Sequence, residues 1–154
     1  MKTEIVANSL LSLAKDKGET LTHLKVQKLL YFLNGWNLAL NGSPLLDDEF
    51  QAWRHGPVIP SLYNELRGFG FKPIDRYIQH LDTEKFELVT HRVSKENVDF
   101  WNLLNQVWEK YAGFTALQLS TLSHEAGSPW DITPKDHAIN SDVIRQYFQG
   151  KLTQ

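Results

Sequence analysis

The sequence predicts a mostly α-helical domain of the α+β class. We expect a compact bundle of about six or seven short helices around a central hydrophobic helix at about residues 23–41, with one small two-stranded β-hairpin. Most segments repeat apolar residues at helical spacing, while only short stretches alternate polar and apolar residues as a strand does. The chain has 154 residues, of which 42% are hydrophobic and 12% aromatic. A single domain over residues 1–154 can therefore bury a full core.

Charge, cysteine content and hydropathy exclude several classes of protein. Sixteen Lys and Arg against eighteen Asp and Glu give a net charge of −2, which disfavours sequence-independent nucleic-acid binding because that binding neutralises phosphates. Cysteine is absent, so disulfides, thiol nucleophiles and thiolate metal sites are excluded. Glu4 and Asn8 interrupt the N-terminal segment where a signal peptide needs an apolar run, and no stretch suits a membrane span. We expect a cytoplasmic protein.

The first two helices have clear boundaries in the sequence. Apolar residues recur with helical period over 3–17, and Gly18 ends that segment. Thr22 is a typical N-cap and Gly42 a typical stop for the next helix. That second helix carries apolar side chains on most of its faces, which indicates a position at the centre of the fold.

Polar residues on the central helix are informative because the rest of the helix is apolar. Gln27, Tyr31 and Asn34 form a seam at positions i, i+4 and i+7, with Lys25 and Lys28 beside it. In the favoured interpretation, the lysines extend to solvent and neighbouring loops satisfy the seam. In the alternative, these residues anchor a fixed internal contact or a partner.

The middle of the chain combines short strands with one helix. Residues 49–53 alternate polar and apolar side chains, which predicts a strand that is broken by a turn at 54–57. Pro60 suits the first turn of a helix covering 61–67. Weak alternation within 71–93 allows a second strand that pairs with 49–53.

Four helices are predicted in the remainder of the chain, each from its N-cap. Ser94 precedes a strongly periodic segment that Gly113 ends. Thr115 caps the next helix, and Ser128 followed by Pro and Trp marks a short one. The last helix is expected at 141–149 with a serine cap.

No catalytic motif supports an enzyme. The alternative to a binding protein is a His- or metal-dependent hydrolase centred on His55 and His124, but neither has a nameable partner and no cofactor is indicated. The basic grouping that comes closest to a nucleic-acid footprint, His23, Lys25 and Lys28, is too small for one. We therefore expect no enzymatic activity and no metal.

Three stretches together resemble a known family. Leu24–Phe32 reads LKVQKLLYF, Phe50–Pro60 reads FQAWRHGPVIP and is followed by Tyr63, and Leu119–Trp130 contains a Leu-Ser, a His and a Pro-Trp pair. The pattern is similar to the Panacea domain of SocA-like antitoxins, also described as phage-associated proteins. The resemblance extends over about residues 3–130.

The resemblance implies an antitoxin of a bacterial or phage toxin–antitoxin system. Such a protein neutralises a cognate protein toxin by direct binding, and some members act instead as adaptors that deliver the toxin to a protease. The chemistry of the motif residues favours a scaffold role over toxin contact. Carried over by position, the motif residues are Lys25, Lys28, Tyr31, Trp53, His55, Gly56, Pro57, Tyr63, His124 and Trp130.

Partner-binding residues are expected in the part of the chain with the weakest core periodicity. Protein interfaces use aromatic anchors more than bulk charge. The candidate exposed anchors are Phe69, Phe71, Tyr77 and Phe86.

Overall fold

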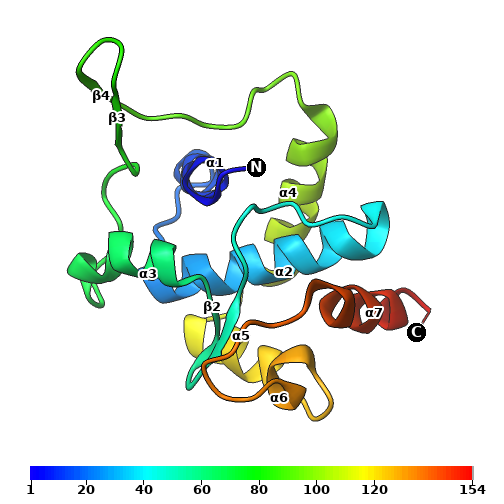
Figure 1. The fold of residues 1–154 in the computed structure, drawn as a ribbon. Helices are drawn as coiled ribbons and strands as arrows, with labels where there is room; N and C mark the ends of the chain where they lie inside the picture. The colour runs from blue at the N-terminus through cyan, green and yellow to red at the C-terminus, as the bar shows by residue number, and fades with distance from the viewer. Residues whose placement is uncertain (154) are drawn as a thin grey trace.

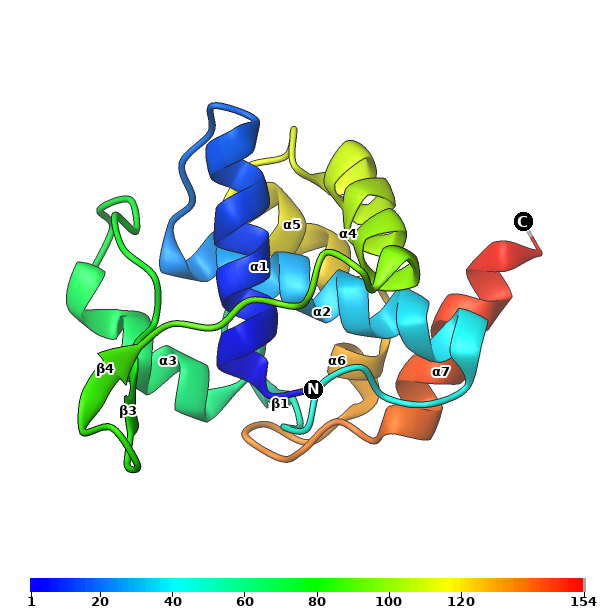
Figure 2. The same cartoon turned by 90° about the horizontal axis from the view of Figure 1, so that it is seen from above.

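The computed structural model describes residues 1–153 as a helical bundle with two small β-hairpins (Figures 1 and 2). The predicted mostly α class is confirmed. The elements in chain order are α1 (Thr3–Asp16), α2 (His23–Asn41), β1 (Gln51–Trp53), β2 (Gly56–Val58), α3 (Pro60–Leu66), the 3₁₀ turn η1 (Arg67–Phe69), β3 (His80–Asp82), β4 (Glu87–Val89), α4 (Val98–Tyr111), α5 (Ala116–Ser123), α6 (Pro129–Ile132) and α7 (Ser141–Leu152).

Helix α2 is the centre of the molecule, as its apolar faces predict. Figure 2 shows α1 crossing one side of α2, while α4, α5 and α7 pack around it. The rings of Phe32 on α2 and Tyr111 on α4 stack with centroids 4.2 Å apart. Gly35 allows α7 to approach, because a Cβ at this position would lie 2.3 Å from the ring of Phe148. Among the helices of residues 1–153, none is long and apolar enough to cross a membrane.

The predicted ends of the first two helices are confirmed. The Thr22 hydroxyl accepts a hydrogen bond from the Lys25 backbone N–H at 3.4 Å, which is the capping contact expected at an N-cap. Gly42 adopts a left-handed conformation with φ of 78° at the end of α2. Such a conformation favours glycine, which explains why the helix stops there.

The strand pairing differs from the sequence-based expectation, which is wrong on this point. Strand β1 pairs with β2, where Ala52 lies opposite Pro57, and β3 pairs with β4 in a second antiparallel hairpin. Strand β1 pairs with the strand that follows it directly, because Gly56, at φ of 115°, allows the chain to reverse after Trp53. The other edge of β1 bonds to residues 136–139, where the Ile139 N–H donates to the Phe50 carbonyl at 2.7 Å.

The C-terminal helices exist as predicted, but two begin with different caps. Asn97, not Ser94, caps α4 by accepting from the Phe100 N–H at 3.2 Å. Asn140, not Ser141, caps α7, which extends past Gln149 to Leu152. Asn97 follows the expected Ser94 by three residues and Asn140 directly precedes the expected Ser141. Both residue types cap well, so propensity alone does not separate them. The remaining caps, Thr115 and Ser128, are confirmed.

Candidate functional site

Two polar side chains of α2 hold the segment that follows the β1–β2 turn. The Lys28 ammonium donates to the Pro57 carbonyl at 3.0 Å. The Gln27 amide donates to the Ile59 carbonyl at 3.0 Å and accepts from the Ile59 N–H at 2.9 Å. Lys28 is 1% exposed, so the expectation that it extends to solvent is wrong. We call this set of contacts the Lys28 latch.

The other seam residues also have internal roles. The Lys25 ammonium donates to the Ala112 carbonyl at 2.6 Å, so it too makes a fixed contact inside the molecule. The Asn34 side-chain oxygen accepts from the Leu45 N–H at 2.9 Å, as expected for a seam satisfied by a loop. The Tyr31 hydroxyl is buried and has no hydrogen-bond partner among the described residues.

Helix α5 closes the turn of the first hairpin from the opposite side. A Cβ on Gly56 would lie 2.9 Å from both the Lys28 side chain and the Ser123 hydroxyl. The Ser120 hydroxyl donates to the His55 carbonyl at 2.6 Å. Glycine is therefore required at this position by both the backbone angle and the close approach. The two serines were not predicted as site residues, although their i, i+3 spacing beside inward-facing Leu119 is a usable signal.

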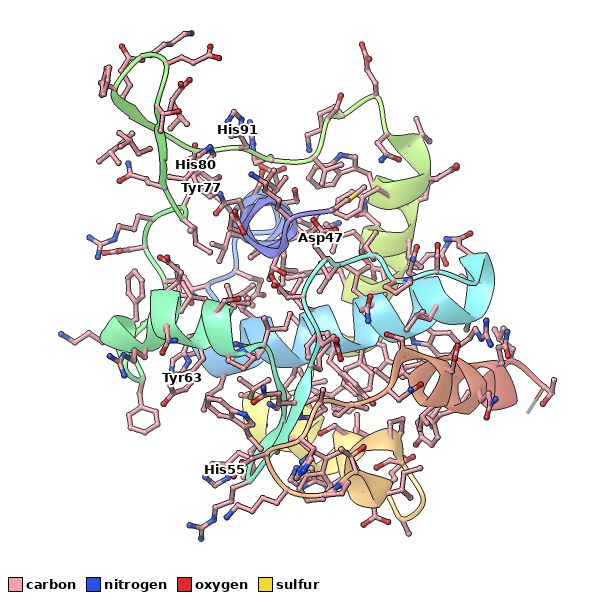
Figure 3. All side chains as sticks on the ribbon, viewed as in Figure 1. Asp47, His55, Tyr63, Tyr77, His80 and His91 are labelled. Atoms are coloured by element: carbon pink, nitrogen blue, oxygen red, sulfur yellow. The ribbon has the colours of Figure 1, made fainter. Side chains whose placement is uncertain are left out.

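An aromatic layer covers the outer side of the same hairpin. The Trp130 indole N–H donates to the Trp53 carbonyl at 2.6 Å, and the Trp130 ring stacks on His124 with centroids 3.8 Å apart. Tyr63 of α3 packs edge-on against Trp53, 5.0 Å between centroids. Figure 3 shows His55 at the tip of the hairpin and Tyr63 beneath α3.

Burial lowers the proton affinity of the basic groups around the latch. Desolvation lowers the pKa of Lys28 to about 7. The pKa of His23 is lowered by burial and by the nearby Lys28 charge, and the pKa of His124 is lowered by burial, Lys28 and His55. Lys28 bonds a backbone carbonyl in this setting, so it acts as a buried hydrogen-bond donor that positions the hairpin.

The two histidines of the hydrolase alternative have different surroundings. His55 is exposed, whereas the His124 ring is covered by Trp130, and its buried Nε2 has no hydrogen-bond partner within residues 1–153. Neither residue lines the cavities described for this chain. Within residues 1–153, no group of three His, Cys, Asp or Glu side chains could hold a metal ion.

The four candidate anchor residues divide into two pairs. Phe71 is 91% exposed and Phe86 is 83% exposed. Phe69 and Tyr77 are half-buried and pack against the core, and the Arg76 guanidinium lies 5.1 Å above the Phe69 ring. Only Phe71 and Phe86 are therefore fully available at the surface.

The β3–β4 hairpin is tied to the molecule at its base. The Asn8 side chain accepts from the Ile78 N–H at 2.7 Å and donates to the carbonyls of Ile78 and His91, at 2.9 and 3.1 Å. The Ser9 hydroxyl accepts from the Val93 N–H at 2.8 Å. This role of α1 was not predicted, although two adjacent polar residues on a mostly apolar helix are a usable signal. Figure 3 shows His91 and His80 together near this base.

Comparison with known proteins agrees with the motif resemblance. Residues 26–131 match the family model described as "Antitoxin SocA-like, Panacea domain". The chain belongs to this family. Antitoxin SocA of Caulobacter vibrioides (strain NA1000 / CB15N) is 33% identical over 136 residues, which cover 88% of this chain and 71% of that protein. No solved structure matches the chain.

The matched range contains most of the geometry described above. It includes the whole β1–β2 hairpin, helix α5 and the β3–β4 hairpin. Of the ten motif residues, only Lys25 lies outside it.

Proposed function

We propose that this protein is an antitoxin that neutralises a cognate protein toxin by direct, non-enzymatic contact. Membership of the SocA-like antitoxin family supports the general role. The proposed contact surface rests on one observation, the exposure of Phe71 and Phe86 in a segment at the edge of the molecule.

The contact surface is the outer edge, which we define as residues 67–91. Both cartoon views place this segment along one side of the molecule, away from α4 and α7 (Figures 1 and 2). Besides the two phenylalanines, Leu81 and Leu88 of the paired strands are 53% and 65% exposed. Leu81, Phe86 and Leu88 belong to the β3–β4 hairpin, whereas Phe71 precedes it in the chain. Exposed large apolar side chains are typical of protein-binding surfaces.

The conformation of Phe86 adds to this interpretation. Its φ of 52° lies in the left-handed region, which bulky residues rarely adopt. Phe86 is the last residue of the turn that joins β3 and β4, so the angle serves to reverse the chain, and it leaves the ring 83% exposed at the tip of the hairpin.

The family motif has a scaffold role in this proposal. Lys28, Gly56 and Pro57 are buried and offer no surface to a partner. Their contacts fix the β1–β2 hairpin on α2, which supports a scaffold role for the motif. The residues that choose a toxin lie elsewhere, on the outer edge.

Co-expression with the adjacent reading frame tests the role. Expressed alone, that neighbour should arrest growth, and the wild-type chain should relieve the arrest. The Phe71→Ala/Phe86→Ala variant should lose relief while keeping its melting temperature. The matched control is Leu117→Ala, since Leu117 is 77% exposed on α5, outside the outer edge. Full relief by the double variant, or loss of relief in the control, would show that the proposed surface is wrong.

A purified system separates neutralisation from proteolytic delivery. Direct contact predicts a stable complex of the two proteins and toxin inhibition with no protease present. If the toxin keeps its full activity in the complex and disappears only when a protease is added, the chain is an adaptor and direct neutralisation is refuted.

A further inference from the structure

A cavity of about 570 Å³ lies where the outer edge meets α1 and the segment that joins α1 to α2. Figure 2 shows the α1–α2 segment and the outer edge on the same side of α1. They are joined by the Ile74 N–H, which donates to the Leu21 carbonyl at 2.8 Å. Binding pockets in proteins have volumes of about 300–1,000 Å³, so this cavity is large enough to receive a whole side chain.

The outer edge supplies one wall of the cavity. Ile74, Tyr77 and Thr90 line it from that side, and Leu11 and Thr20 line it from the other. Both threonines are exposed. A partner that rests on the outer edge therefore reaches the cavity without displacing any part of the chain.

The apolar walls can be touched by an entering group. Leu11 and Ile74 each keep 8% of their surface accessible. Tyr77, which is labelled in Figure 3, is half-buried and packs against the core. An apolar side chain placed against these residues leaves water, which stabilises the complex.

The charged residues of the rim balance one another. Lys15 and Arg76 are exposed cations, and Glu19 and Asp75 are exposed anions. None of the four belongs to an ion pair within residues 1–153. A charged side chain would meet as many like charges as opposite ones, whereas a neutral one meets no repulsion. The backbone that carries it can accept from the cations and donate to the anions. The rim therefore favours a neutral occupant on a peptide segment.

We propose that this cavity receives one large apolar side chain of the toxin when the toxin covers the outer edge. The inference rests on the proposed function and adds a second kind of contact to it. Phe71 and Phe86 project into the toxin, and the toxin's side chain projects into the cavity. Interface anchors typically fill pockets of the partner in this way. Tyr77, expected from the sequence as an exposed anchor, is here part of the pocket wall.

Filling the mouth of the cavity tests the proposal. Thr20→Trp places an indole at an exposed position of the rim and leaves all residues of the outer edge unchanged. Affinity for the purified product of the adjacent reading frame, measured by calorimetric titration, should fall at least about tenfold with the melting temperature kept. The matched control is Thr121→Trp, at an exposed threonine of α5 outside the cavity lining and the outer edge. It should bind as the wild type does.

Methyl NMR of the wild-type complex measures the same contact without a substitution. When the protons of the toxin are saturated, the methyl signals of Leu11 and Ile74 should lose intensity, because the toxin's side chain lies against them. The methyl signals of Leu104, which is 1% exposed on α4 and does not line the cavity, should keep theirs.

The outcomes separate this inference from the proposed function. Absence of any complex with the wild-type chain overturns both. A complex that forms as tightly with Thr20→Trp as with the wild type, or an equal loss in Thr121→Trp, overturns the pocket alone. If Thr20→Trp does not fold, the methyl measurement decides, and unchanged Leu11 and Ile74 signals refute the pocket.

Discussion

The two β-hairpins have the same local form and opposite environments. Each consists of two antiparallel strands of three residues. All three residues of β2 are buried, whereas Leu81 and Leu88 of the β3–β4 hairpin are largely exposed. The position of each hairpin relative to α2, and not its strand pairing, therefore decides whether it is part of the core or of the surface.

The attachments of the hairpins explain this difference. The β1–β2 hairpin is held along its length. The Lys28 latch holds β2, Ser120 bonds to the turn, and residues 136–139 bond to the outer edge of β1. The β3–β4 hairpin is attached to α1 at its base, through Asn8 and Ser9. Damage to the first should affect the whole fold, and damage to the tip of the second should affect only binding.

The largest effect is expected from Gly56→Ala in the inner hairpin. The new Cβ would meet Lys28 and Ser123 at 2.9 Å in a backbone conformation that alanine rarely adopts. Strain and overpacking together should lower the free energy of unfolding by about 2–5 kcal/mol in urea titrations. The matched control is Gly42→Ala, which also has positive φ but no neighbour within 4 Å, and should cost about 1 kcal/mol. Equal losses in both variants would contradict the close approach.

The second-largest effect is expected in the pH dependence of the free energy of unfolding, through the titration of Lys28. The folded pKa is about 7, below the ordinary value, so between pH 7 and 10 the unfolded chain binds more protons than the folded chain. The free energy of unfolding should therefore rise with pH, by about 2 kcal/mol between pH 7 and 9.

The Lys28→Met variant isolates this contribution. It should lack the rise between pH 7 and 9 in urea titrations across that range. His23 and His124, whose pKa values are lowered by burial and by Lys28, act in a separate window. Their contribution to stability is lost as pH falls through 6.5 and below, and Lys28→Met should reduce it without removing the part due to burial. The same slope in variant and wild type above pH 7 would show that Lys28 is not the titrating group.

A smaller effect is expected at the base of the outer hairpin. Asn8→Ala removes three hydrogen bonds to Ile78 and His91 and should lower the free energy of unfolding by about 1–3 kcal/mol. Amide exchange should speed up most in residues 78–91. Uniform loss of protection over the whole chain, with no excess in this segment, would contradict the attachment described here.

The smallest effect is expected at the tip of the outer hairpin. Phe86→Ala should change the free energy of unfolding in urea titrations by less than about 0.5 kcal/mol, because the ring is 83% exposed. Tyr77→Ala is the comparison, since Tyr77 packs against the core and its loss should be measurably destabilising. A large destabilisation by Phe86→Ala would assign its ring to the core.

The sequence by itself determined the helices, most of their caps and the central position of α2. These features depend on local signals, such as the Thr22 cap, Gly42 and the apolar faces of α2, that operate within one or two turns. The family resemblance also came from the sequence, because its motifs are strings of neighbouring residues.

Only the tertiary structure decided which hairpin is buried, what Lys28 does and which aromatic side chains are exposed. Lys28 is drawn inside by a carbonyl 29 residues away, at Pro57, and Phe69 and Phe71 differ in exposure although they are two residues apart. Burial of a side chain depends on which distant parts of the chain pack against it. Local periodicity does not predict those contacts.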